Sequence, residues 1–205
     1  MTDMDAFRDA VTAWAARGPA GPAREAAEGL CVRTVVLLEG KSDLAAVDAL
    51  AAIRGRDLAA EGVCLLSMGG AMNVGRFARF LGPPGLGLRL LGGCDEAERG
   101  WYERAFAAVG VPSERISVCA ADLEDELVRA LGVTRVEELV RAQGDQRPLA
   151  TFLRQPEQRH RTDRQRLRRF FGTRSGRKIT YGRVLVEALD PDRVPAPLDH
   201  LLAGL

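Results

Sequence analysis

The chain alternates short apolar runs of strand length with longer segments in which apolar residues recur at helical spacing. The apolar runs, rich in Val, Ile and Leu, lie at residues 32–38, 63–66, 86–91 and 115–119, and each is followed by a helical pattern. This alternation predicts an α/β fold with a four-stranded, mainly parallel sheet, helices on both faces and right-handed crossovers.

The segments on either side of this α/β pattern contain only helical patterns. Near the amino terminus, Phe7, Val11 and Trp14 fall at helical spacing, which predicts a short docking helix. From about Thr134 onward no further strand pattern occurs. We therefore expect three parts: a helical extension over residues 1–30, an α/β domain over 31–132 and a helical, Arg-rich region over 133–205.

Charge separates the helical region from the rest of the chain. The net charge is only +1, but residues 144–183 carry +9 and the remaining residues carry −8. Such a basic stretch is typical of a surface that holds a nucleic-acid backbone. The residues expected to contact nucleic acid are Lys41, Arg168, Arg169, Arg174 and Arg177.

Two interpretations of the aromatic residues in this basic stretch stay open. Phe170, Phe171 and Tyr181 supply side chains that stack on bases in nucleic-acid-binding proteins. Alternatively, the arginines form a solvated helical face, and Phe170 and Phe171 belong to the hydrophobic core.

Acidic residues follow three of the four predicted strands. Glu39 and Asp43 follow the first strand, Asp95 the third, and Asp122 and Glu124 the fourth. Because the carboxyl ends of parallel strands share one edge, a strand order of 2-1-3-4 places Glu39 opposite Asp95 at the switch point. Converging carboxylates repel one another unless a cation neutralises them. Oxygen ligands without a His or thiolate cluster indicate Mg²⁺ or Mn²⁺. Because these ions also bind substrate phosphates, the predicted reaction is phosphodiester chemistry.

The alternative is that these acids cap helix N-termini, where they favourably meet the helix dipole. That interpretation applies to Asp43, Asp122 and Asp125. It fits Glu39 less well, because Glu39 lies at a strand end before Gly40 rather than at an ordinary capping position.

Several other classes are excluded by spacing. A phosphate-binding loop ending in Gly40-Lys-Ser42 needs a Gly at position 35, which is Val35. The four cysteines lack zinc-site spacing. No apolar run is long enough for a membrane helix and the N-terminus is acidic, so we expect a cytoplasmic protein that does not engage membranes.

Four motifs in order carry a resemblance to a known family. Leu38-Glu-Gly-Lys-Ser-Asp43 resembles the opening motif of a TOPRIM domain, followed by Gly69-Gly70, Asp95 and Asp122-Leu-Glu124 after the later strands. The resemblance covers about residues 31–131 and implies a TOPRIM fold, which is Rossmann-like. With the basic helical region downstream, the chain is most similar to the TOPRIM half of OLD-family (overcoming lysogenization defect) endonucleases.

This resemblance implies metal-dependent cleavage of a DNA phosphodiester with Mg²⁺ or Mn²⁺, and DNA is favoured over RNA. Glu39 would act in acid/base or metal chemistry, and Lys178 would steady the charged transition state. The implied metal ligands are Glu39, Asp43, Asp95, Asp122 and Glu124.

Two departures from the family pattern leave alternatives open. TOPRIM proteins usually carry Asp-x-Asp after the third strand; here Gly93 takes the first position, and Glu96 or Glu98 could compensate. OLD nucleases carry an ATPase domain that this length does not accommodate, so we expect a separate ATPase partner, and a homodimer is a further expectation. The alternatives are a catalytically weakened TOPRIM module that binds nucleic acid or a partner, and a small TOPRIM ribonuclease, against which the incomplete Asp-x-Asp counts.

Overall fold

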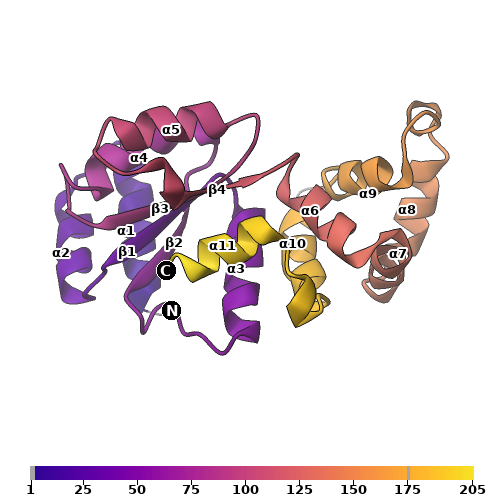
Figure 1. Cartoon of the computed structure of the whole chain (residues 1–205), viewed down its shortest axis with the longest axis horizontal. Helices are drawn as coiled ribbons and strands as arrows, with labels where there is room; N and C mark the ends of the chain where they lie inside the picture. Colours follow the sequence, from indigo (N-terminus) through magenta and orange to yellow (C-terminus); the bar gives the residue numbers. More distant parts are fainter. Residues whose placement is uncertain (1–2, 175) are drawn as a thin grey trace.

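A four-stranded parallel sheet forms the centre of the computed structural model, which describes residues 3–174 and 176–205 (Figure 1). The strand order is β2-β1-β3-β4, which is the order considered from the sequence. The order of the strands reverses between β1 and β3, and ligands of open parallel sheets bind at such a switch point. The strands are β1 (Thr34–Leu38), β2 (Val63–Ser67), β3 (Arg89–Asp95) and β4 (Ile116–Cys119). The predicted α/β fold class is confirmed.

The third strand differs most from its predicted bounds. It begins and ends later than expected and finishes at Asp95, so that Gly92 and Gly93 pair within the sheet. Glycine is rare in strands because it offers no side chain to pack, which is why the pattern indicated a strand end here. Packing explains the exception: a Cβ at Gly92 would lie 2.7 Å from the ring of Tyr102.

Helices cover both faces of the sheet, and alternate strand residues point to each. Val35 and Leu37 join the core on one face, whereas Val36 and Leu38 join the core on the other. The first face is covered by α1 (Asp3–Ala15), α2 (Gly21–Gly29), α4 (Val74–Leu81) and α5 (Arg99–Ala107). The second face is covered by α3 (Lys41–Ile53) and α11 (Ala196–Ala203).

The remaining helices form a lobe beside the sheet (Figure 1). They are α6 (Leu123–Leu131), α7 (Val133–Ala142), α8 (Gln146–Leu153), α9 (Asp163–Phe171) and α10 (Arg177–Glu187). Short 3₁₀ turns, η1 (Ala71–Asn73), η2 (Ser113–Arg115), η3 (Pro156–Gln158) and η4 (Pro191–Arg193), lie in the connections. After this lobe, α11 returns to pack against β3 and β4, so the end of the chain lies with the sheet rather than with the Arg-rich helices.

A close contact between α10 and α3 brings the helical lobe to the edge of the sheet. A Cβ at Gly182 of α10 would lie 2.6 Å from the carbonyl oxygen of Ser42 in the first turn of α3, so only glycine fits there. Lys178 lies four residues before Gly182, and therefore one helical turn nearer the start of α10. This packing places Lys178 beside the loops that follow β1 and β4.

Within the described residues, no helix is long and apolar enough to cross a membrane.

Candidate metal and phosphate site

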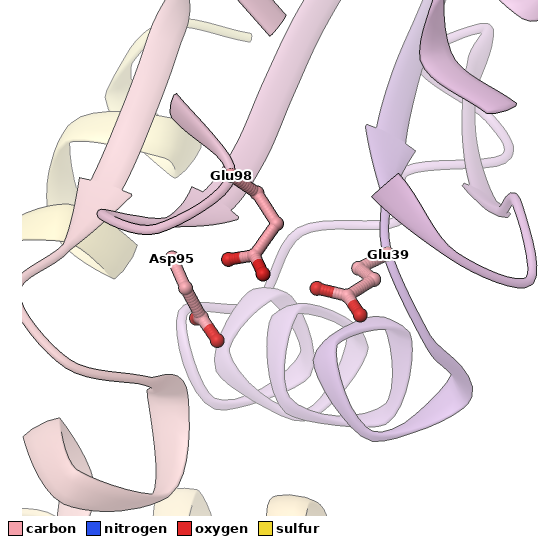
Figure 2. A group of neighbouring side chains, drawn as sticks. All are labelled: Glu39, Asp95 and Glu98. Atoms are coloured by element: carbon pink, nitrogen blue, oxygen red, sulfur yellow. The ribbon is translucent and has the colours of Figure 1, made fainter. Parts of the chain in front are cut away.

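Three carboxylates meet where β1 and β3 end (Figure 2). Glu39 directly follows β1, Asp95 is the last residue of β3, and Glu98 lies just before α5. One carboxylate oxygen from each lies within 4.8 Å of the others, and all three residues are partly buried. The backbone N–H of Glu98 donates to the carbonyl of Asp95 (3.0 Å), and this turn directs the Glu98 side chain back toward the strand ends.

The side chains of these three carboxylates lack direct hydrogen-bond and ion-pair partners among the described residues, which are 3–174 and 176–205. Oε2 of Glu98 is buried without a partner in this part of the chain. Burial and the charge of Glu98 raise the pKa of Glu39. Burial, together with Asp122 and other neighbouring carboxylates, raises the pKa of Asp95 to about 8. A cluster of converging, unpaired oxygen ligands fits a hard divalent cation.

Glu98, rather than Glu96, joins the cluster. Glu96 is exposed and lies 3.8 Å from Arg99 on the surface. The sequence named both residues as candidates to replace a missing ligand, but only the turn after β3 shows which one faces the cleft. The missing ligand itself has a packing explanation, because a Cβ at Gly93 would lie 2.9 Å from Leu38 and 3.5 Å from Leu201.

The acids on the other side of the cleft are hydrogen-bonded. Oδ2 of Asp43 accepts from the backbone N–H of Gly40 (2.9 Å), and Oδ1 of Asp122 accepts from that of Asp125 (2.8 Å). Both residues thus cap a helix, as the alternative interpretation held. Arg168 forms an ion pair with the second oxygen of Asp122.

Glu124 is the most buried acid of this second half, and it pairs with Lys178, whose side chain is exposed. Glu124 is 2% exposed, its Oε2 accepts from Nζ of Lys178 (3.1 Å), and its Oε1 is buried without a partner. Burial raises the pKa of Glu124 and of Asp43, the latter to about 6. Burial alone would lower the pKa of Lys178, but the charge and hydrogen bond of Glu124 together with the charges of Asp122 and Asp43 outweigh it, so that the pKa is raised and the ammonium is retained.

Glu39 and Asp95 of the first half line the same cleft as the second half, and its volume is about 420 Å³. It contains all five predicted metal ligands, both lysines of the chain and the glycine pair after β2. Its charged lining consists of Glu39, Lys41, Asp43, Asp95, Asp122, Glu124 and Lys178. The structure thus brings these residues together, and their binding of metal or nucleic acid stays a prediction.

The predicted nucleic-acid contacts differ in their surroundings. Arg169 and Arg174 are exposed, whereas Arg168 is paired with Asp122. Arg177 is 8% exposed, pairs with both oxygens of Asp145 (3.0 and 3.2 Å) and lies over the ring of Phe170 (4.1 Å). Its guanidinium therefore serves the packing of the lobe, which counts against the predicted contact with nucleic acid.

The prediction that aromatic residues of this lobe stack on bases is wrong. Phe170, Phe171 and Tyr181 are 1%, 0% and 1% exposed, and Phe171 stacks on Tyr181 with 4.6 Å between ring centroids. They belong to the hydrophobic core of the lobe, together with Leu167 of α9 and Leu185 of α10. The interpretation that placed Phe170 and Phe171 in the core was correct.

The comparisons with known proteins agree with this architecture. Residues 30–95 match the family described as "Overcoming lysogenization defect protein-like, TOPRIM domain". The structure is similar to the C-terminal region of the Burkholderia pseudomallei OLD protein (TM-score 0.65, 18% identity, covering 84% of this chain and 96% of that chain). It is also similar to the C-terminal region of the Xanthomonas campestris pv. campestris OLD protein (TM-score 0.63, 22% identity, covering 84% and 93%). Among curated proteins, none matches the sequence.

The fold and the strand-end acids agree with the match of residues 30–95 to an OLD-like TOPRIM domain. The fold is similar to that of the C-terminal regions of OLD proteins, and the resemblance identified from the four motifs is confirmed. At these sequence identities the structural similarity establishes the fold alone, and the chemistry depends on the residues that this chain places at the site.

Proposed function

We propose that this protein cleaves phosphodiester bonds of DNA with the help of Mg²⁺ or Mn²⁺. The observation that supports the proposal most directly is the cluster of Glu39, Asp95 and Glu98, whose oxygens converge without a hydrogen bond or ion pair from the described residues. An unneutralised cluster of this kind is costly to a folded protein, and a bound cation removes the repulsion. The similarity to OLD-like TOPRIM domains supports a nuclease over other metal-dependent enzymes.

The residues that would hold the metal fit a hard cation. Glu39, Asp95 and Glu98 offer oxygen atoms only, and the buried Oε1 of Glu124 offers a further oxygen without a partner. Bound there, the metal would supply positive charge to phosphate oxygens and lower the pKa of a coordinated water. Asp43 uses one oxygen for a helix cap, so its second oxygen would contribute, whereas Asp122 would have to give up its pair with Arg168 to do so.

The protein's own residues would perform the remaining tasks. The Nζ of Lys178 donates to one oxygen of Glu124 and keeps further donor capacity for the charge that develops on a phosphate. Burial and the charge of Glu98 raise the pKa of Glu39, and a carboxyl with a raised pKa is a better proton acceptor, which suits Glu39 to the acid/base role. Lys41 starts α3 at the rim of the cleft and would attract the negatively charged strand.

The test is cleavage of supercoiled plasmid and linear DNA by the purified protein with Mg²⁺, Mn²⁺ or a chelator. We expect cleavage only with metal, and its loss in Glu39→Gln and Glu98→Gln. Glu103→Gln is the matched control, since Glu103 lies on α5 in an exposed pair with Arg99 and does not face the cleft. Full activity of both cleft variants would show that the site is assigned wrongly.

Calorimetric titration of Mn²⁺ into the same proteins separates the proposed nuclease from the non-catalytic alternative. We expect Mn²⁺ binding by the wild type and by Glu103→Gln, and weaker binding by Glu39→Gln and Glu98→Gln. Salt-sensitive DNA binding without Mn²⁺ binding or cleavage would support the catalytically weakened module instead. Preference for structured RNA over DNA would support a TOPRIM ribonuclease.

Two partner proposals rest on the family resemblance alone. We propose that a separate ATPase protein and a second copy of this chain assemble with it. Light scattering of the purified protein tests the homodimer. A change in plasmid cleavage when a candidate ATPase and ATP are added together tests the ATPase partner.

A further inference from the structure

A basic groove adjoins the metal cleft on the helical lobe. Its volume is about 490 Å³, and it is lined by side chains of α8, α9 and the loops that flank α9. Asp122 and Lys178 line both the groove and the metal cleft. The two hollows are therefore neighbours, and a chain of linked phosphates could extend from one into the other.

The charges of the groove are unevenly compensated. It contains four cationic side chains and only one acidic one. Arg168 and Lys178 are paired with Asp122 and Glu124, whereas Arg161 and Arg169 have no acidic partner among the described residues. The groove thus keeps two uncompensated guanidinium groups beside a site proposed to act on phosphates.

The surroundings of Arg161 provide a second observation that points to an anion-binding site. Its Nε is buried and has no hydrogen-bond partner within the described part of the chain. A buried donor that lacks a partner is unfavourable, and native structures rarely keep one without a water or ligand. Other arginines around the groove are satisfied, for example Arg164 by Asp125 (3.0 Å) and Arg166 by Asp163 (2.9 Å).

We propose that Arg161 and Arg169 bind a backbone phosphate of the DNA strand next to the phosphate that is cleaved. A guanidinium presents paired donors that match phosphate oxygens, and it stays charged at every relevant pH. This inference rests on the proposed function for the position of the cleaved phosphate. It implies that the preferred substrate is a polynucleotide and that the strand runs over α9 before it reaches the cleft.

The experiment measures DNA binding by fluorescence anisotropy across a salt series, in the presence of a chelator so that no cleavage occurs. We expect Arg161→Gln and Arg169→Gln each to bind a labelled oligonucleotide severalfold more weakly. We also expect the slope of log affinity against log salt to decrease by about 0.7 to 0.9 for each lost phosphate contact. Arg79→Gln is the matched control, because Arg79 is an exposed arginine of α4 on the far side of the sheet.

Two further measurements keep the result interpretable. Thermal unfolding of each variant, with Arg161→Lys and Arg169→Lys alongside, shows whether the fold is intact, and the lysine variants should regain part of the salt slope. Mn²⁺ titration should be unchanged in the glutamine variants, because neither arginine lines the metal cleft.

The outcomes separate this proposal from the proposed function. If wild-type protein binds DNA through the groove but never cleaves it, the proposed function fails and the groove assignment stands. If folded glutamine variants keep wild-type affinity and salt slope, the groove assignment is overturned even where the wild type cleaves DNA. Absence of DNA binding by the wild type also overturns it.

Discussion

The two halves of the acidic cleft contain similar residues but differ in what neutralises them. At the ends of β1 and β3, Glu39, Asp95 and Glu98 converge without an ion pair or hydrogen bond in the described part of the chain. At the start of α6, Asp122, Glu124 and Asp125 are each paired with a cation from α9 or α10, namely Arg168, Lys178 and Arg164. One half holds unpaired negative charge, and the other joins the helical lobe to the sheet.

This difference shows that acidic residues at strand ends serve two purposes in one cleft. The paired half positions α9 and α10, and with them Lys178 and the groove arginines, next to the unpaired half. The unpaired half is where a cation gives the greatest relief of repulsion. We therefore expect substitutions in the unpaired half to affect chemistry first, and substitutions in the paired half to affect stability as well.

Asp95→Asn tests the unpaired half and should have the largest effect. We expect at least about a thousandfold loss of plasmid cleavage, at the upper end of what one lost electrostatic contact costs. The same change should raise the metal-free unfolding temperature, because an amide avoids the cost of burying an ionisable carboxyl beside other carboxylates. Asp122→Asn should instead lower the free energy of unfolding by about 1 kcal/mol, through the lost pair with Arg168. Equal effects on stability would remove the distinction between the halves.

Lys178 joins the two halves, and its substitutions should have the next largest effect. We expect Lys178→Ala to reduce cleavage about a hundredfold, because a charge beside the developing phosphate charge is lost. Lys178→Arg should retain part of the activity, since the charge stays while the geometry changes. The measurement is single-turnover cleavage with saturating metal. If both variants cleave like the wild type, Lys178 has no part in the chemistry.

The substitution Gly93→Asp tests whether the unpaired half accepts another carboxylate. Gly93→Asp should lower stability by about 1–3 kcal/mol, because the new side chain must displace Leu38 or Leu201. We expect no gain in Mn²⁺ affinity, measured by calorimetry beside denaturant unfolding. Tighter Mn²⁺ binding in a stable variant would show instead that the glycine does mark a lost ligand.

The pH dependence of stability should show the smallest effect. The pKa of Asp95 is about 8 and that of Asp43 is about 6, both above the values in the unfolded chain. Between about pH 4 and 8 the native state thus binds more protons than the unfolded state, and the contribution of these groups to metal-free stability falls as pH rises. Urea unfolding in a chelator should show this decline, and Asp95→Asn should flatten it. Saturating Mn²⁺ should reverse it, because metal binding requires deprotonated carboxylates.

Much of the fold followed from local pattern. Apolar runs of strand length between amphipathic helices were sufficient to predict a parallel sheet with helices on both faces. The same regularity placed Glu39, Asp43, Asp95, Asp122 and Glu124 at one edge, since the carboxyl ends of parallel strands share that edge. The bounds of β3 were less accessible, because two glycines within a strand are required by Tyr102 and Leu38, which come from other elements.

The sequence by itself therefore determined the sheet, the edge at which its acids gather and the resemblance to TOPRIM domains. Only the tertiary structure decided which charges remain unpaired. Arg161, Arg168 and Arg177 look equivalent in sequence. Arg161 lines a groove and has no acidic partner among the described residues, Arg168 pairs with Asp122, and Arg177 is buried against Asp145. The physical reason is that pairing depends on distances between side chains of different elements, and these distances are set by how α9 and α10 pack against α3 and α6.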